Sequence, residues 1–143
     1  LGLRGIVFAP FIHYSINHLI LNSAPLAFLS WLVLTKGTTN FLRVSLTVLL
    51  TSGFLVWALA RPQYHIGASG LVLGYFSYLV TNSLIERSWS ALLMGAATVL
   101  IYGGLLLTVL PMEGEVSWEN HLAGLVAGAL AAIVLVPNEK EKR

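Results

Sequence analysis

Four side chains in the sequence could together carry out nucleophilic chemistry. Ser69 is a possible nucleophile, and it lies between two glycines in the run 67–70. His121 could act as its base, because a serine hydroxyl needs a neighbour that takes its proton and histidine titrates near neutrality. His18 and Asn22 are four residues apart, so they share a helix face and could donate hydrogen bonds to one atom.

No carboxylate is placed to complete a triad with these residues. All six acidic residues are glutamates, and none lies within the apolar segments described below. Glu119 is two residues from His121, so it points to a different face of a helix. The absence of aspartate excludes a two-aspartate protease site, and the sequence holds no His-Glu-x-x-His zinc motif. The inventory therefore supports a serine–histidine dyad.

The composition is that of a membrane protein. The chain has 143 residues, of which 57% are hydrophobic and 10% are charged, whereas a soluble domain carries about 25% charged residues. The eight basic residues are few and scattered, which does not indicate nucleic-acid binding. The chain has no cysteine, so a disulfide framework and a thiolate metal site are both excluded.

Five segments are long and apolar enough to be membrane-spanning helices, which need about 20 mainly apolar residues. They cover residues 16–34, 42–60, 69–85, 90–110 and 120–136. The breaks between them carry charges, prolines and glycines. We expect an all-α fold, a polytopic membrane helical bundle that forms a single domain over residues 1–143.

The charges at the breaks predict the orientation of the bundle. Six basic residues fall on one side of the membrane, which the positive-inside rule makes cytoplasmic. They are Lys36, Arg43, Arg87, Lys140, Lys142 and Arg143. Only Arg4 and Arg61 fall on the other side, so we expect the start of the chain outside the cytoplasm.

The reactive side chains are expected at one depth in the bilayer. Ser69, His18 and His121 each lie 16 or 17 residues from the cytoplasmic end of their segment, or about 25 Å along a helix. The hydrocarbon core is about 30 Å thick, so all three would lie a short way below the outer surface.

Two glycine pairs predict which helices meet. Gly70 and Gly74 open the third segment, and Gly124 and Gly128 open the fifth. Small residues four positions apart let two helix backbones approach closely in lipid. Close approach of these two helices would bring the serine within reach of His121.

The surroundings of Ser69 suit a developing negative charge. Gly67 and Gly70 flank it and are expected to leave room for a substrate backbone. A helix that begins at Ser69 also offers free N–H groups and the positive end of its dipole, and both stabilise an oxyanion.

Three motifs in the chain resemble those of the rhomboid family of intramembrane serine proteases. The stretch from His13 to Asn22 resembles the family's HxxxxHxxxN motif, with His18 at its centre. Residues 67–70 resemble its GxSG motif, and residues 121–128 resemble its HxxGxxxG motif. The motifs occur in the family's order and cover nearly the whole chain.

The resemblance implies a serine endopeptidase that works without cofactor or metal. Ser69 would be the nucleophile and His121 the general base. His18, Asn22 and the backbone N–H of Ser69 would form the oxyanion hole, with His13 as a supporting residue at the rim. The substrates would be transmembrane proteins, cleaved near the outer membrane face by a multi-pass protein of a bacterial-type plasma membrane.

The chain departs from the family pattern in two ways. The family core has six spans, so the resemblance implies five transmembrane helices here, in a rhomboid protease domain lacking the first transmembrane helix. Many members also carry an aromatic residue four positions after the nucleophile, where it packs on the catalytic histidine. This chain has Leu73 at that position.

Simpler roles and other functions stay open. Ser69 could be only a helix N-cap, and His18 and Asn22 could only join helices through hydrogen bonds. A catalytically inactive rhomboid-like protein could bind transmembrane segments. The four histidines could instead ligate a metal ion or haem, although His65 matches no motif and is expected to be an ordinary loop residue.

Overall fold

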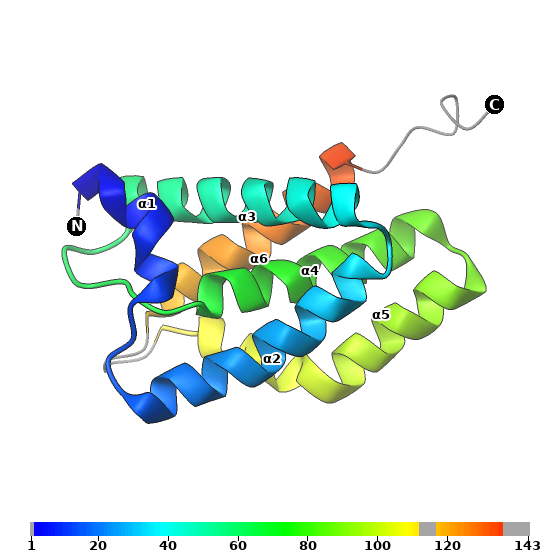
Figure 1. Ribbon diagram of the computed structural model, residues 1–143, viewed down its shortest axis with the longest axis horizontal. Coiled ribbons are helices and arrows are strands. Elements are labelled where there is room, and N and C mark those ends of the chain that lie inside the picture. The colour runs from blue at the N-terminus through cyan, green and yellow to red at the C-terminus, as the bar shows by residue number, and fades with distance from the viewer. Residues whose placement is uncertain (1, 112–116, 136–143) are drawn as a thin grey trace.

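Helices make up all the regular structure in the described parts of this computed structural model, residues 2–111 and 117–135. The long helices run back and forth along one axis of the molecule (Figure 1). They are α2 (Ile16–Leu34), α3 (Thr38–Leu59), α4 (Ser69–Glu86), α5 (Trp89–Tyr102) and α6 (Trp118–Leu135). The 3-10 segment η3 (Gly103–Val109) continues α5.

A short helical segment that was not predicted from the sequence precedes α2. It consists of η1 (Gly2–Arg4), α1 (Gly5–Phe8) and η2 (Ala9–Phe11). The segment packs on α3 at Gly53, where an added Cβ would lie only 2.7 Å from the Ile6 carbonyl oxygen. This contact places the segment beside the same end of the bundle as the start of α2 (Figure 1).

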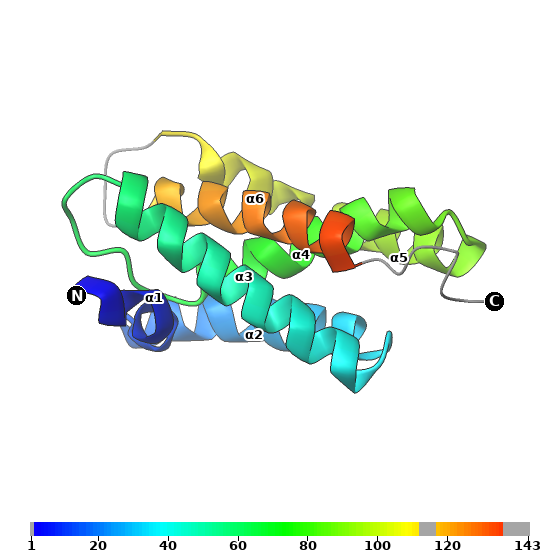
Figure 2. The ribbon, with the colours of Figure 1, turned by 90° about the horizontal axis from the view of Figure 1, so that it is seen from above.

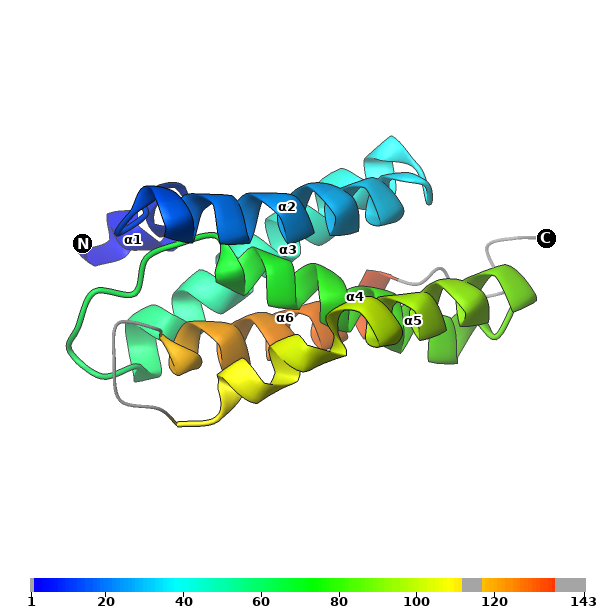
Figure 3. The same ribbon diagram turned by 90° about the horizontal axis from the view of Figure 1, so that it is seen from below.

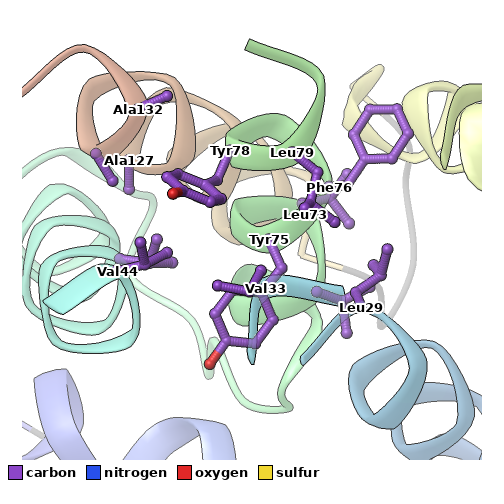
Figure 4. Close-up of a cluster of buried hydrophobic side chains, with 13 residues drawn as sticks. Leu29, Val33, Val44, Leu73, Tyr75, Phe76, Tyr78, Leu79, Ala127 and Ala132 are labelled. Atoms are coloured by element: carbon purple, nitrogen blue, oxygen red, sulfur yellow. The ribbon is translucent and has the colours of Figure 1, made fainter. Parts of the chain in front are cut away.

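Helix α4 occupies the centre of the bundle. Figures 2 and 3 show it from opposite sides, with α2 on one side and α6 on the other. Residues 72–79 of α4 are all buried. Its side chains radiate toward Leu29 and Val33 of α2, Val44 of α3 and Ala127 of α6 (Figure 4).

The polar side chains of α4 find partners on the surrounding helices. The Tyr75 hydroxyl lies 2.7 Å from the hydroxyl of Ser45 on α3. Ser77 donates to the carbonyl oxygen of Leu125 on α6 at 2.7 Å. Because unpaired polar groups are costly in lipid, a helix with this composition is stable only where protein surrounds it.

Four helical stretches in the described residues are long and apolar enough to cross a membrane: α2, α3, α5 together with η3, and α6. They fit an integral, multi-pass membrane protein. The sequence predicted five such spans, and α4 is not among the four. With 18 residues, α4 is about 27 Å long, but its tyrosine, serine and asparagine side chains make it less apolar than its neighbours.

The expected helix ends differ from the structure in two places that matter for the charges. Helix α3 begins directly after Gly37, which has a φ of 105° and so interrupts the helical backbone before α3. Arg43 therefore lies within α3 rather than in the connection. Helix α6 begins at Trp118, which places Glu119 in its first turn, although no glutamate was expected inside a span. Glu113, Glu115 and the charged tail 139–143 lie outside the described residues.

Helices α4 and α6 pack backbone against backbone. A Cβ on Gly124 would overlap the carbonyl oxygen of Gly70, and a Cβ on Gly128 would overlap that of Gly74. The contact therefore requires glycine at both positions of α6. It begins beside the first turn of α4 and continues toward the centre of the bundle.

We expect Gly128→Ala to lower the free energy of unfolding by at least about 1–3 kcal/mol, because the new methyl group would meet a fixed carbonyl oxygen. Gly104→Ala in η3 is the matched control, since a Cβ there meets nothing within 4 Å. Thermal unfolding of both variants in detergent micelles measures the difference. Equal stabilities would contradict the close packing of α4 and α6.

Candidate active site

The candidate residues gather at one end of the bundle. Helices α2, α4 and α6 all begin there, next to the loop of residues 60–68 that joins α3 to α4 (Figure 1). Three helix N-termini bring backbone N–H groups and positive dipole ends to this region. The arrangement suits chemistry in which negative charge develops.

Ser69 is the first residue of α4, as the sequence predicted. The N-cap of this helix is Ala68, which makes no side-chain capping bond, so Ser69 is not an N-cap. Its hydroxyl oxygen instead accepts a hydrogen bond from Nδ2 of Asn120 at 3.2 Å. The simpler interpretation of Ser69 as a capping residue is therefore wrong.

Side chains of other helices lie directly against the two glycines beside Ser69. A Cβ on Gly67 would lie 2.7 Å from Cε1 and 2.8 Å from Nε2 of His18, and 3.5 Å from Nδ2 of Asn22. A Cβ on Gly70 would lie 2.6 Å from Oδ1 of Asn120. The small size of the two glycines therefore lets His18 and Asn120 approach the chain on either side of the serine.

His18 presents a donor to this region. The backbone N–H of Tyr14 donates to its Nδ1 at 3.4 Å, and the two rings stack with centroids 5.9 Å apart. Because Nδ1 accepts, the proton of the neutral ring lies on Nε2. The Nε2–H group then lies against Gly67, two residues before Ser69. Asn22, one turn further along α2, brings its amide to the same glycine.

His121 has the opposite arrangement. Its buried ring places Nδ1 3.0 Å from the carbonyl oxygen of Thr108. A carbonyl oxygen can only accept, so the proton of the neutral ring lies on Nδ1 and Nε2 keeps a free lone pair. Thr108 lies in the last turn of η3, where backbone carbonyls have no partner within the helix. The helix end therefore fixes the ring in the form that a general base requires.

Ser69 and His121 are brought to the same region through the glycine contact. Asn120 touches the Ser69 hydroxyl, and Gly124, one turn after His121, packs on Gly70. Within residues 2–111 and 117–135, the bond to the Ser69 hydroxyl comes from Asn120, and no hydrogen bond joins Ser69 to His121. The dyad therefore stays a prediction.

His13 and Leu73 lie around this region. The His13 ring meets His18 edge-on at 5.1 Å, and its Nε2 atom is buried without a hydrogen-bond partner among the described residues. Leu73 is buried in the hydrophobic core cluster. The contact between His13 and His18 is compatible with a supporting role for His13. Whether Leu73 helps to orient His121 stays an open prediction.

The 60–68 loop is tied to the start of α6 by side chains that the sequence did not single out. His65 contacts the Ser117 hydroxyl through Nδ1 and lies 2.8 Å from the Arg61 carbonyl oxygen through Nε2. Arg61 forms an ion pair with Glu119. The hydrogen bond to this carboxylate raises the pKa of Arg61, so the pair stays charged. His65 lies in the loop, as expected, and it also bridges this loop to the start of α6.

The same loop is held on its other side by the N-terminal segment. Gly67 donates its backbone N–H to the Ala9 carbonyl oxygen at 3.0 Å, and the Tyr14 hydroxyl donates to the Tyr64 carbonyl oxygen at 2.8 Å. A cavity of about 330 Å³ lies between this segment, α3 and the loop, and Gly67, Gly70 and Asn120 are among its lining residues. The loop that leads to Ser69 is therefore fixed from both sides.

A metal site finds no ligand set in the described part of the chain. No three of its His, Asp and Glu side chains lie close enough to hold an ion together, and the sequence has no cysteine. Both ring nitrogens of His65 face protein groups. The geometry gives the metal or haem alternative no support.

Comparison with known proteins identifies one family. A family model described as Rhomboid domain matches residues 2–138. An uncharacterized protein of Mycobacterium tuberculosis is 34% identical over 99% of this chain and 63% of its own length. An uncharacterized protein of Mycobacterium leprae is 35% identical over 99% of this chain and 59% of its own length. The chain thus spans less than two thirds of either relative.

A more distant relative carries the family in its name. A protein of Acanthamoeba polyphaga mimivirus, named as a rhomboid protein, is 28% identical over 91% of this chain and 73% of its own length. Comparison with solved structures finds no match.

We expect Gly67→Ala to destabilise the protein more than Gly37→Ala does, by about 1–3 kcal/mol. Both glycines have φ near 105°, so each alanine would strain the backbone. Only the alanine at 67 would also displace the His18 ring, because a Cβ at 37 meets nothing within 4 Å. Unfolding of the two variants in micelles measures the difference, and equal losses would show that His18 does not fill this space.

Proposed function

The chain belongs to the rhomboid family, and we propose that it is an intramembrane serine endopeptidase with Ser69 as nucleophile and His121 as general base. One observation carries the proposal: at the end of the bundle where α4 begins at a serine, Nδ1 of His18 faces a backbone N–H group and Nδ1 of His121 faces a carbonyl oxygen, which implies opposite tautomers. His18 offers a proton there, and His121 offers a lone pair. Acyl transfer needs one group of each kind.

The first chemical step is the acylation of Ser69. Nε2 of His121 takes the hydroxyl proton as Oγ forms a bond to the scissile carbonyl carbon, and the carbonyl oxygen becomes negative. When this intermediate collapses, the C–N bond breaks and His121 passes the proton to the leaving amine. Water then hydrolyses the acyl-enzyme with His121 again as base, which restores the serine hydroxyl.

The negative carbonyl oxygen needs donors that are already in place. The backbone N–H of Ser69 is free at the start of α4. Nε2–H of His18 and Nδ2 of Asn22 converge beside Gly67 from the neighbouring helix. We assign these three groups to the oxyanion hole, with His13 supporting the His18 ring.

The substrates are transmembrane proteins, cleaved near the outer face of a bacterial-type plasma membrane. The apolar helices that surround the site support its location within the lipid bilayer. Lys36 and Arg87 lie at the opposite end of the helices from the site, and Arg61 lies at the site's end, in agreement with a cytoplasmic far end. The chemistry uses only side chains and backbone groups of this chain, without cofactor or metal.

We predict that Ser69→Ala and His121→Ala each abolish cleavage of a transmembrane reporter by the purified protein. Either loss should cost nearly as much as losing both, because the two residues act as one unit. A fluorophosphonate should label the parent protein but not Ser69→Ala, and the exposed Ser90→Ala is the matched control.

Full cleavage by Ser69→Ala would contradict this assignment. An unlabelled, inactive parent protein would instead favour a rhomboid relative that only binds transmembrane segments. Activity that a chelator removes and zinc restores would favour a metal enzyme.

We predict that Asn22→Ala lowers turnover by about 10²–10³-fold, because one prepared oxyanion donor is lost. Substrate binding should change little, since the ground-state carbonyl carries less charge. Adding His18→Ala should lower turnover further. Asn17→Ala, an exposed asparagine on the same helix, is the control. If Asn22 only joins helices, the variant will instead show a lower melting temperature with nearly full turnover.

A further inference from the structure

Asn120 is the one described side chain with a hydrogen bond to the Ser69 hydroxyl, and no family motif includes it. Its Nδ2 atom donates to Oγ of Ser69 at 3.2 Å. Its Oδ1 atom packs over Gly70, where a Cβ would lie 2.6 Å away. Glycine at position 70 is therefore what admits the amide to the serine.

This hydrogen bond sets the direction of the serine proton. A hydroxyl has one proton and two lone pairs, and the amide nitrogen can only donate. While Oγ accepts from Asn120, its own proton stays free to point toward another acceptor. The free lone pair on Nε2 of His121, the next residue in the chain, is the acceptor that the dyad requires.

The bond also becomes stronger as the reaction proceeds. Oγ carries only a partial charge at rest, and it gains negative charge as its proton leaves. Hydrogen bonds to charged oxygens are about twice as strong as those to neutral ones. The gain is lost in the neutral ester and returns when Oγ departs during deacylation. An interaction that strengthens only near the transition state raises turnover rather than binding.

Asn120 is held in position by a chain of hydrogen bonds that runs from the start of α6 to the 60–68 loop. Its backbone N–H donates to the Ser117 hydroxyl oxygen at 3.1 Å. Ser117 donates its own proton to Nδ1 of His65, and Nε2–H of His65 donates to the Arg61 carbonyl oxygen. His65 lies four residues before Ser69, so the chain of bonds returns to the serine's own loop. Each donor in this chain has one acceptor, so the bonds tie the start of α6 to the loop that precedes Ser69.

We propose that Asn120 is an additional catalytic residue, whose amide holds the Ser69 hydroxyl toward His121 and stabilises the charge that develops on Oγ. The inference rests on the proposed protease function. It assigns to Asn120 a separate task from the oxyanion donors His18 and Asn22, because Asn120 contacts the nucleophilic oxygen itself.

The test compares Asn120→Ala and Asn120→Asp with the parent protein in detergent micelles. Asn120→Ala should lower both turnover and the rate of fluorophosphonate labelling by about 10- to 100-fold, the worth of one hydrogen bond to a charged oxygen. The KM for the reporter should not change. Asn120→Asp has nearly the same shape, but its carboxylate would accept the serine proton and turn it away from His121, so this variant should be slower still.

Asn40→Ala is the matched control for a purely structural loss. Asn40 also donates from its amide to a hydroxyl, that of Tyr78 at 2.9 Å, but it lies at the far end of the bundle. This variant should lower the melting temperature and leave turnover unchanged. Asn120 variants that melt early but turn over at the parent rate would overturn the inference and leave the protease function standing. A parent protein that neither cleaves the reporter nor takes up the label would overturn both.

Discussion

The contact between the backbones of α4 and α6 is the constraint on which the site depends. In lipid, apolar side chains gain little by leaving one apolar surrounding for another, so helices associate through close packing and hydrogen bonds. Gly124 and Gly128 allow that packing because they have no side chain between the backbone of α6 and the carbonyl groups of α4. Asn120 and His121 lie one turn before this contact. Asn120 contacts Ser69 at the start of α4 because the glycines let the two helices lie this close together.

Much of this arrangement could be predicted from the sequence, because a membrane restricts what a chain can do. Apolar runs predicted the long helices, and Ser69 is the first residue of α4 as expected. The groups that were missed share a physical reason. The Thr108 carbonyl that orients His121 is a backbone atom, which every residue possesses, and Ser117 lies 52 residues from its partner His65. Neither leaves a pattern in the sequence.

The glycines beside Ser69 illustrate what a sequence pattern leaves undetermined. Their small size was predicted to leave space for a substrate, and the structure adds that His18 and Asn120 approach them closely. Each glycine therefore admits one polar side chain from a neighbouring helix to the serine. A glycine pattern alone states that something approaches the backbone, and only the fold states what it is.

The polar surface of α4 has a consequence for how the protein is made. Helices α2 and α3 can enter the bilayer as they leave the ribosome, because their own side chains favour lipid. Helix α4 emerges next. The hydroxyl of Ser77 cannot yet form its hydrogen bond, because the Leu125 carbonyl of α6 is synthesised 48 residues later. Until α6 is made, the side of α4 that faces α6 has no protein partner. Newly made chains should pass through an intermediate in which α2 and α3 are inserted and α4 stays at the translocation machinery until α6 packs against it.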